Sequence, residues 1–362
     1  MPNPQRHSHP FVEIVAGEYR ASISTFGGGL HSLEYAGKPL VASYPHGEYP
    51  PLSSGIVLAP WPNRTADGVF AHDGVLHRLD ISEPGRATAI HGFVGQMVWQ
   101  VAEKGEDFVA LELSTGLRQG WPWPLRMRIT WRLHAGTDAS AAAAHPTDDG
   151  AGDASTATAE GLTAVFEVKN EADASCPFGL GWHPYLSALG APLDDCVLHL
   201  PVGTNLPLDS VRNLPAGPEF PASTVLPDLD KGQRMAGVWL DHCFGQAGPG
   251  QGEQATAGHH ADDTGQPSQP GTATTEAQLL NAEGEGVRLW VGEGFGWFQV
   301  FTADPARREG YPGVGRALAV EPMTCPPDAL RSGRDLIRLQ AGEQRSFECG
   351  IGVARAREGV TK

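Results

Sequence analysis

The chain has 362 residues, of which 40% are hydrophobic, and a formal net charge of −16 at pH 7. Nucleic acids and anionic membranes select basic surfaces, so this charge argues against both as partners. No apolar run approaches the roughly 18 residues of a membrane-spanning helix, and residues 1–10 lack the apolar core of a signal peptide. We therefore expect a cytoplasmic protein.

Short β-strands dominate the expected secondary structure. The 46 glycines and 30 prolines suit many turns. Apolar and polar residues alternate in 109–113, 125–133, 162–168 and 287–291, which is typical of strands with one buried face. A long amphipathic helix pattern is absent. The sequence predicts an all-β chain, and we interpret 1–362 as one domain.

Two segments interrupt the β pattern, at about 134–160 and 245–276. Both are rich in small and polar residues and contain no lysine or arginine. Such composition buries too little apolar surface to offset the entropy of ordering. Because β-patterned sequence resumes after each, we expect surface insertions without regular structure, the first of them an extended hairpin tip.

Glu321 is a candidate general base. It follows the apolar run 318–320, and Pro322 favours an extended backbone at Glu321. A carboxylate at the end of a buried strand is partly desolvated, which raises its pKa towards a range useful for a base. The alternative interpretation is an exposed glutamate at the end of a strand.

His183 is a candidate general acid in the segment Gly-Trp-His-Pro-Tyr, residues 181–185. Its aromatic neighbours are typical of sugar pockets, although a buried core histidine would give the same pattern. Arg64 could donate hydrogen bonds to sugar hydroxyls or pair with a carboxylate. His91, before a glycine, has the same two interpretations, and Asp241 could instead cap a turn.

Metals and nucleotide cofactors have no motif in this sequence. The 14 histidines include no HExxH pair, and no cysteine–histidine set has ligand spacing. The five cysteines are scattered, which favours reduced, mostly buried thiols. Neither GxGxxG nor GxxxxGK[ST] occurs. We therefore expect no cofactor and no metal.

Five short segments, taken in order, resemble the aldose 1-epimerase (galactose mutarotase) family. They are NR at 63–64, HG at 91–92, GWHPY at 181–185, LD with a downstream aromatic at 240–244, and AVEP at 319–322 with PPDA at 326–329. Each segment alone is weak evidence for the family, but the five in this order form a specific pattern. The resemblance covers nearly the whole chain outside the two insertions, and it implies a large antiparallel β-sandwich with a sugar groove.

The resemblance also implies roles for these residues. Glu321 would take the proton of the anomeric hydroxyl, and His183 would protonate the ring oxygen from the opposite side of the sugar. Arg64, His91 and Asp241 would bind sugar hydroxyls. Asn63 would support Arg64.

The resemblance implies an isomerase that interconverts the α and β anomers of a free hexose of the glucose or galactose type. One alternative is a hexose-6-phosphate mutarotase, for which Arg307, Arg308 and Arg316 are candidate phosphate ligands. Another is a non-catalytic sugar-binding protein on the same scaffold. Residues 301–316 and the FVGQ that follows HG depart from the usual family pattern, which leaves the hexose open. A monomer or a homodimer is expected.

Overall fold

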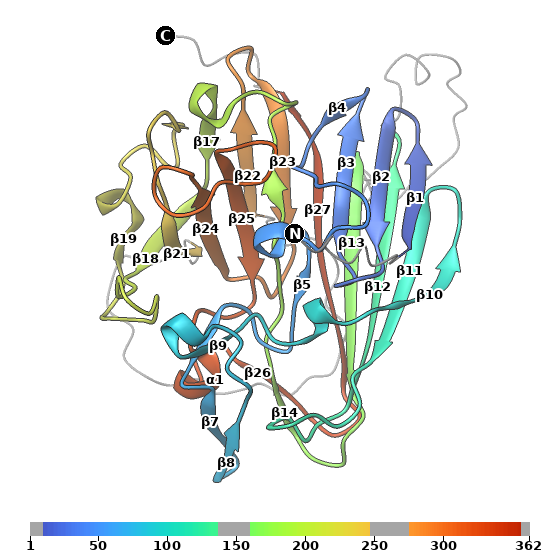
Figure 1. Ribbon diagram of the computed structural model, residues 1–362, viewed down its shortest axis with the longest axis vertical. Coiled ribbons are helices and arrows are strands. Elements are labelled where there is room, and N and C mark those ends of the chain that lie inside the picture. The colour runs from blue at the N-terminus through green and yellow to red at the C-terminus, as the bar shows by residue number, and fades with distance from the viewer. Residues whose placement is uncertain (1–9, 137–159, 247–274, 356–362) are drawn as a thin grey trace, which may run out of the picture.

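The computed structural model describes residues 10–136, 160–246 and 275–355. Strands are the dominant regular secondary structure of these ranges, and their one α-helix is the short α1 (Ala329–Ser332) (Figure 1). No helix in this part of the chain is long and apolar enough to cross a membrane. The prediction of an all-β chain is therefore confirmed.

The larger sheet has nine strands, and its pairings are antiparallel. In spatial order the strands are β10 (Gln100–Lys104), β11 (Phe108–Ser114), β12 (Leu125–His134), β13 (Gly161–Asn170), β27 (Gln344–Arg355), β23 (Glu285–Val291), β22 (Thr275–Leu280), β17 (Val197–His199) and β20 (Gln233–Arg234). All four alternating segments lie in this sheet. Their apolar residues are buried, as at Met127, Ile129 and Trp131.

A second, eight-stranded sheet carries much of the candidate site, and its pairings are also antiparallel. Its strands in spatial order are β19 (Phe220–Pro221), β18 (Val202–Leu206), β21 (Asp241–Gln246), β24 (Trp297–Ala303), β25 (Ala317–Met323), β15 (Gly181–Trp182) and β5 (Val57–Leu58), with β16 (Tyr185–Leu186) also paired to β25.

Smaller sheets complete the described structure. The four-stranded one comprises β1 (Phe11–Ala16), β2 (Tyr19–Ser24), β3 (Leu30–Tyr35) and β4 (Lys38–Pro39). The two-stranded ones are β6 (Arg64–Ala66) with β9 (Thr88–Ile90), β7 (Val69–His72) with β8 (Val75–Arg78), and β14 (Cys176–Phe178) with β26 (Ile337–Leu339).

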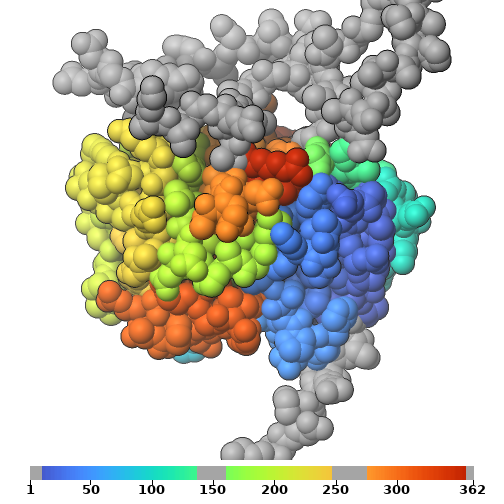
Figure 2. Space-filling model, turned by 90° about the horizontal axis from the view of Figure 1, so that it is seen from above, coloured from blue at the N-terminus to red at the C-terminus, as the bar shows by residue number. Residues whose placement is uncertain are grey.

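One apolar core joins the sheets into a sandwich. Ile14 and Ile23 of the four-stranded sheet, Leu111 of the nine-stranded sheet and Val320 of the eight-stranded sheet belong to one cluster of buried side chains. The Trp131 ring lies 5.4 Å from that of Trp182, between centroids, and so connects the two large sheets. Seen from above, the N-terminal strands lie directly beside the green and orange segments (Figure 2). The predicted β-sandwich is confirmed.

The two predicted insertions fall mostly outside the described residues, which omit 137–159 and 247–274. At the base of the first, His134 of β12 pairs with Gly161 of β13, so a hairpin connection is confirmed there. The approximate limits of the second each shift by two residues. Strand β21 extends to Gln246 and β22 begins at Thr275, because Gln246 pairs with Val202 and Thr275 with Val291.

Candidate active site

The six predicted site residues line one cavity of about 180 Å³. They reach it from separate elements of the fold: Asn63 and Arg64 at the start of β6, His91 after β9, His183 between β15 and β16, Asp241 at the start of β21, and Glu321 in β25. Antiparallel pairing of β21, β24 and β25 brings Asp241 and Glu321 to the same region of the sheet. Segments far apart in sequence therefore meet at one site.

Glu321 lies within its strand, not at the strand's end as the sequence predicted. Strand β25 continues through Pro322 to Met323, because it pairs with β24 over its whole length. Glu321 is only 2% exposed. The interpretation as an exposed glutamate is therefore wrong, and the carboxyl group lies on the cavity wall within a largely desolvated strand.

His183 and Glu321 contact each other directly. His183 Nε2 lies 3.2 Å from Glu321 Oε1, so the expectation that a sugar ring separates them is wrong for this structure. Two buried polar groups side by side are stabilised by bonding to each other, because an unpaired buried polar group is costly. His183 Nδ1 and Glu321 Oε2 have no hydrogen-bond partner in the described residues.

Burial acts in opposite directions on the two pKa values. Loss of solvent raises the pKa of Glu321 well above its usual range, and the nearby Asp241 charge raises it further. Burial also lowers the pKa of His183, to which the Arg64 charge contributes. Both effects favour the neutral forms. A pair in its neutral form would carry one transferable proton on the carboxyl group, within reach of His183 Nε2 at 3.2 Å.

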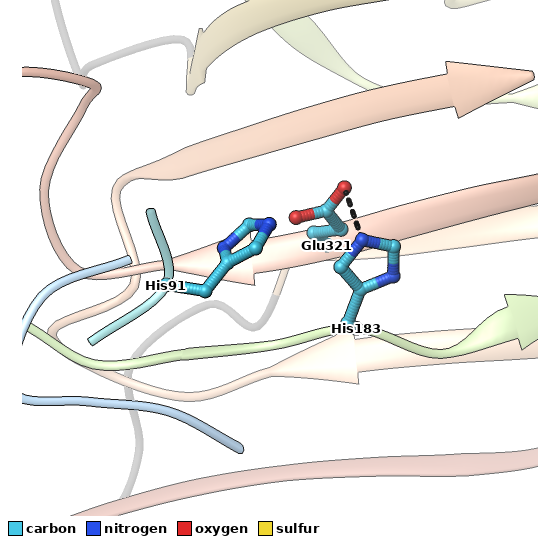
Figure 3. A group of neighbouring side chains, drawn as sticks. All are labelled: His91, His183 and Glu321. Atoms are coloured by element: carbon cyan, nitrogen blue, oxygen red, sulfur yellow. Dashed lines mark ion pairs between the residues drawn. The ribbon is translucent and has the colours of Figure 1, made fainter. Parts of the chain in front are cut away.

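His91 completes a group of three around the carboxyl. The Glu321 carboxyl lies between the rings of His91 and His183 (Figure 3), whose centroids are 5.4 Å apart. The backbone N–H of Asn63 donates to His91 Nδ1 over 3.2 Å. The neutral ring therefore carries its proton on Nε2, and burial, followed by the His183 and Arg64 charges, lowers the pKa of His91. His91 thus offers a donor.

The local backbone around His91 explains the glycine that follows it. A Cβ at Gly92 would lie 1.9 Å from the carbonyl oxygen of Ala59, so no other residue fits without movement. Asn63 and His91 both have positive φ, 52° and 63°. Left-handed backbone is unfavourable for residues other than glycine and tends to occur at functional sites. The left-handed backbone at Asn63 and His91 and the close approach at Gly92 therefore explain the residues found in the NR and HG segments.

The ligand atoms of His91, His183 and Glu321 lie within 4.8 Å of one another, which is close enough to hold a metal ion. Two histidines and a carboxylate are a ligand set of non-haem iron sites. The hydrogen bonding fits such an ion poorly, because the lone pair of His91 Nδ1 already accepts from Asn63 and Nε2 carries the proton. The cluster is better suited to moving protons than to holding a cation.

Arg64 satisfies both of its predicted interpretations. It lines the cavity and also forms a bidentate pair with Glu83, with Nε to Oε2 at 2.7 Å and Nη2 to Oε1 at 3.0 Å. Asn63 Oδ1 accepts from the Arg64 backbone N–H at 2.9 Å, in agreement with the predicted supporting position. The Arg64 side chain is 9% exposed and the Glu83 side chain 18%, and their bidentate contact holds the guanidinium in a fixed orientation at the cavity wall.

Sequence reasoning missed Gln299, which connects the two sides of the cavity. Its Nε2 donates to Asp241 Oδ1 over 2.8 Å, and its Oε1 accepts from Asn63 Nδ2 over 3.3 Å. It is the cross-strand partner of Glu321. A polar residue in the apolar run 297–301 was the available signal. Glu83 and Asn213, which donates to Asp241, have no such sequence signal.

Under the sugar-binding role that the sequence resemblance implies, replacing Gln299 by Leu should raise KM about tenfold while changing kcat less, because Asp241 and Asn63 lose their shared partner. Replacing it by Glu should raise KM further, because a carboxylate would then face Asp241. Steady-state kinetics and thermal unfolding of both variants test this positioning role. Equal KM values for wild type and both variants would refute it.

A larger cavity of about 550 Å³ lies elsewhere and is lined mainly by apolar and small residues. Its charged lining residues, Asp194 and Arg316, pair with each other. It contains none of the predicted site residues. The acid–base chemistry is therefore concentrated in the smaller cavity.

Known proteins share both sequence and fold with this chain. Residues 10–149 and 156–352 match the aldose 1-epimerase family. The uncharacterized protein YihR of Escherichia coli K12 is 30% identical over 332 residues, 92% of this chain and 89% of the relative. The chain therefore belongs to the aldose 1-epimerase family, as its resemblance predicted.

Solved structures agree on the fold. A galactose mutarotase-like protein from Clostridium acetobutylicum has a TM-score of 0.73 at 16% identity, with 96% of each chain covered. Galactose 1-epimerase from Lactobacillus acidophilus has a TM-score of 0.68 at 15% identity, with 96% of this chain and 98% of that chain covered. At these identities the likeness establishes the shared β-sandwich.

Proposed function

We propose that this protein is an aldose 1-epimerase that interconverts the α and β anomers of a hexose, with Glu321 as general base and His183 as general acid. The observation that carries the proposal is the buried contact between the two groups, 3.2 Å long, on the wall of a sugar-sized cavity. Family membership supports it. A glycosidase would use two facing carboxyl groups, whereas here the partner of Glu321 is an imidazole.

The single proton of the pair is sufficient for the reaction. Transfer from Glu321 to His183 across their contact gives a carboxylate base and an imidazolium acid without any exchange with solvent. Sugar hydroxyls that hydrogen-bond to the charged forms favour this transfer, because they replace part of the lost solvation. The resting pair thus has the correct proton count, and substrate binding activates it.

Ring opening then requires two proton transfers. Glu321 removes the proton from the anomeric hydroxyl, the C1–O5 bond breaks as C1=O1 forms, and His183 protonates O5. Rotation about C1–C2 presents the other face of the aldehyde, and the reverse transfers close the ring. We place O1 between Glu321 Oε2 and the Nε2–H of His91, two groups that face each other in Figure 3.

The remaining cavity residues orient the sugar. Arg64 contributes guanidinium donors, and Asp241, held by Gln299 and Asn213, contributes carboxylate acceptors. Tyr185 stacks on His183 at 5.3 Å between ring centroids and provides an apolar face. This arrangement binds a polar ring through its hydroxyls, with the anomeric end at the acid–base pair.

Polarimetry with freshly dissolved α-glucose, α-galactose and their 6-substituted derivatives tests the proposed activity. Catalysed mutarotation of at least one of these sugars, well above the spontaneous rate, is expected. A folded protein that binds these sugars without accelerating their mutarotation would instead favour the non-catalytic sugar-binding alternative. Location in the cytoplasm and a monomeric or dimeric state remain predictions.

The raised pKa of Glu321 predicts a pH-dependent effect on stability. In the unfolded chain Glu321 loses its proton above the ordinary glutamate pKa of about 4.3, whereas in the folded protein it keeps this proton to higher pH. The free energy of unfolding of the wild-type protein therefore decreases as pH rises from the unfolded pKa towards the folded pKa. Gln does not ionise. The Tm of Glu321→Gln relative to wild type should therefore increase from pH 5 to pH 9, as scanning calorimetry would show. A difference independent of pH would contradict the raised pKa.

A further inference from the structure

A second cavity adjoins the candidate active site. Its volume is about 400 Å³, and it shares Asp241 and Arg308 with the sugar cavity. Because Asp241 lies at the junction, a substituent on a sugar held by Asp241 can extend into this second cavity. Its arginines are Arg86, Arg307 and Arg308, beside Trp239.

Two of these arginines have no carboxylate partner among the described residues. Arg307 lies over the Trp239 ring at 5.9 Å from its centroid, and Arg308 is exposed at the border of both cavities. Arg86, by contrast, pairs with Glu83 and donates to Asn213. The cavity therefore contains two guanidinium groups that form no ion pair with a described residue, in a chain whose net charge is −16.

The two acidic residues of this cavity, Asp209 and Asp241, keep their charges but form no ion pair with Arg307 or Arg308 among the described residues, and their oxygens are engaged by other donors. Asp209 accepts from the backbone N–H groups of residues 211, 212 and 214 at 2.7 to 3.0 Å. Asp241 accepts from Asn213 and Gln299. Glu309 lines the sugar cavity but not this one. The lining of the second cavity thus holds three arginines against two aspartates, with the Arg307 and Arg308 guanidinium groups outside any ion pair of the described residues.

An anchored turn holds the two arginines in place. The Asp304 carbonyl accepts from the N–H groups of Arg307 and Arg308 at 3.0 and 3.1 Å, and the Asp304 N–H donates to the Glu309 carbonyl at 2.9 Å. Arg316, which the sequence grouped with the candidate phosphate ligands, instead pairs with Asp194 and Asp304. It lines the larger, separate cavity, and its carboxylate partners leave it no free charge.

We propose that the second cavity is a subsite for an anionic group, a phosphate, sulfonate or carboxylate, carried by the sugar at the end away from its anomeric carbon. The substrate class would then be an anionic aldose rather than the free hexose that the sequence first indicated. Guanidinium forks match the oxygens of such groups. This inference rests on the proposed epimerase function, because it assumes that the sugar binds with its anomeric end at Glu321.

A neutral second sugar ring stacked on Trp239 is the competing occupant. The observations favour the anion, because Arg307 already lies over that ring and a neutral ring would shield two charges from water without compensating them. Neutral disaccharides therefore serve as one arm of the test.

The experiment measures kcat/KM by equilibrium exchange NMR for glucose, glucose 6-phosphate, a 6-sulfonate hexose, glucuronic acid and a neutral disaccharide. At least one anionic sugar should exceed glucose, and its advantage should shrink with added salt. In Arg307→Gln/Arg308→Gln the ratio of kcat/KM for that sugar to kcat/KM for glucose should fall about 10- to 100-fold. Arg20→Gln, the same change on an exposed residue of β2, should leave the ratio unchanged.

The outcomes separate the two proposals. No catalysis with any sugar would refute the epimerase function itself. A kcat/KM for glucose or for the disaccharide that equals or exceeds the values for all the anionic sugars would refute only the anionic subsite. A preference for an anionic sugar that survives intact in Arg307→Gln/Arg308→Gln, with its thermal unfolding unchanged, would also refute this subsite.

Discussion

Glu321→Gln and His183→Asn are each expected to lower kcat for mutarotation by roughly 10²–10⁴, with little change in KM. Each change removes a proton-transfer group that acts mainly in the transition state. The two side chains touch at 3.2 Å, and in the proposed mechanism they share one proton, so neither transfer should proceed normally without the other partner. Steady-state polarimetry over a range of sugar concentrations separates kcat from KM.

The double variant Glu321→Gln/His183→Asn provides the sharper test of a shared proton. Its loss in kcat should fall well short of the product of the two single losses, because residues that act as a unit are not additive. Fully multiplicative losses would show that the two groups act independently. Circular dichroism of all three variants controls for unfolding.

Arg64→Ala is expected to affect both binding and stability strongly. The substitution leaves the partly buried Glu83 without its bidentate partner, although Arg86 stays 3.3 Å away, so the loss should fall below the roughly 3–5 kcal/mol for breaking a fully buried ion pair. Burial raises the pKa of Glu83, but hydrogen bonds and charge from Arg64 outweigh this and hold it below its usual range. KM for sugar should also rise, at least as much as kcat falls. Urea unfolding and kinetics test the two effects separately.

Arg126→Ala is the matched control for Arg64→Ala. Arg126 pairs with Glu171 at 2.8 Å, but its side chain is 59% exposed, and exposed pairs contribute little to stability. Glu83→Gln in the Arg64→Ala background should recover part of the lost stability, because it removes a partly buried charge that has lost its bidentate partner. Equal small losses for Arg64→Ala and Arg126→Ala would show that Arg64 is not a buried structural partner.

The sandwich could be predicted from sequence because strand periodicity is local. Residues 125–133 alternate between buried and partly exposed positions just as their side chains alternate between apolar and polar. The six site residues could be grouped because their motifs occur in a specific order along the chain. Neither inference needs knowledge of which strands are neighbours.

The contacts between site residues could not be predicted, because they depend on strand register. Gln299 faces Glu321 only because β24 and β25 pair in that register, and Glu83 reaches Arg64 through a loop without a recognisable motif. The predicted separation of His183 and Glu321 by a sugar ring was wrong for a related reason. Roles assigned from a family describe the reacting complex, whereas burial brings these two polar groups together in this structure.

The most direct test of the central claim is the rate of anomer exchange catalysed by Glu321→Gln, measured by NMR at equilibrium with the best sugar found for the wild-type protein. Glutamine keeps the shape of the neutral carboxyl but holds no transferable proton. The account predicts exchange roughly 10²–10⁴ times slower than with wild type, in a protein that still folds and binds the sugar. Exchange at a near wild-type rate would contradict the assignment of Glu321 as the base.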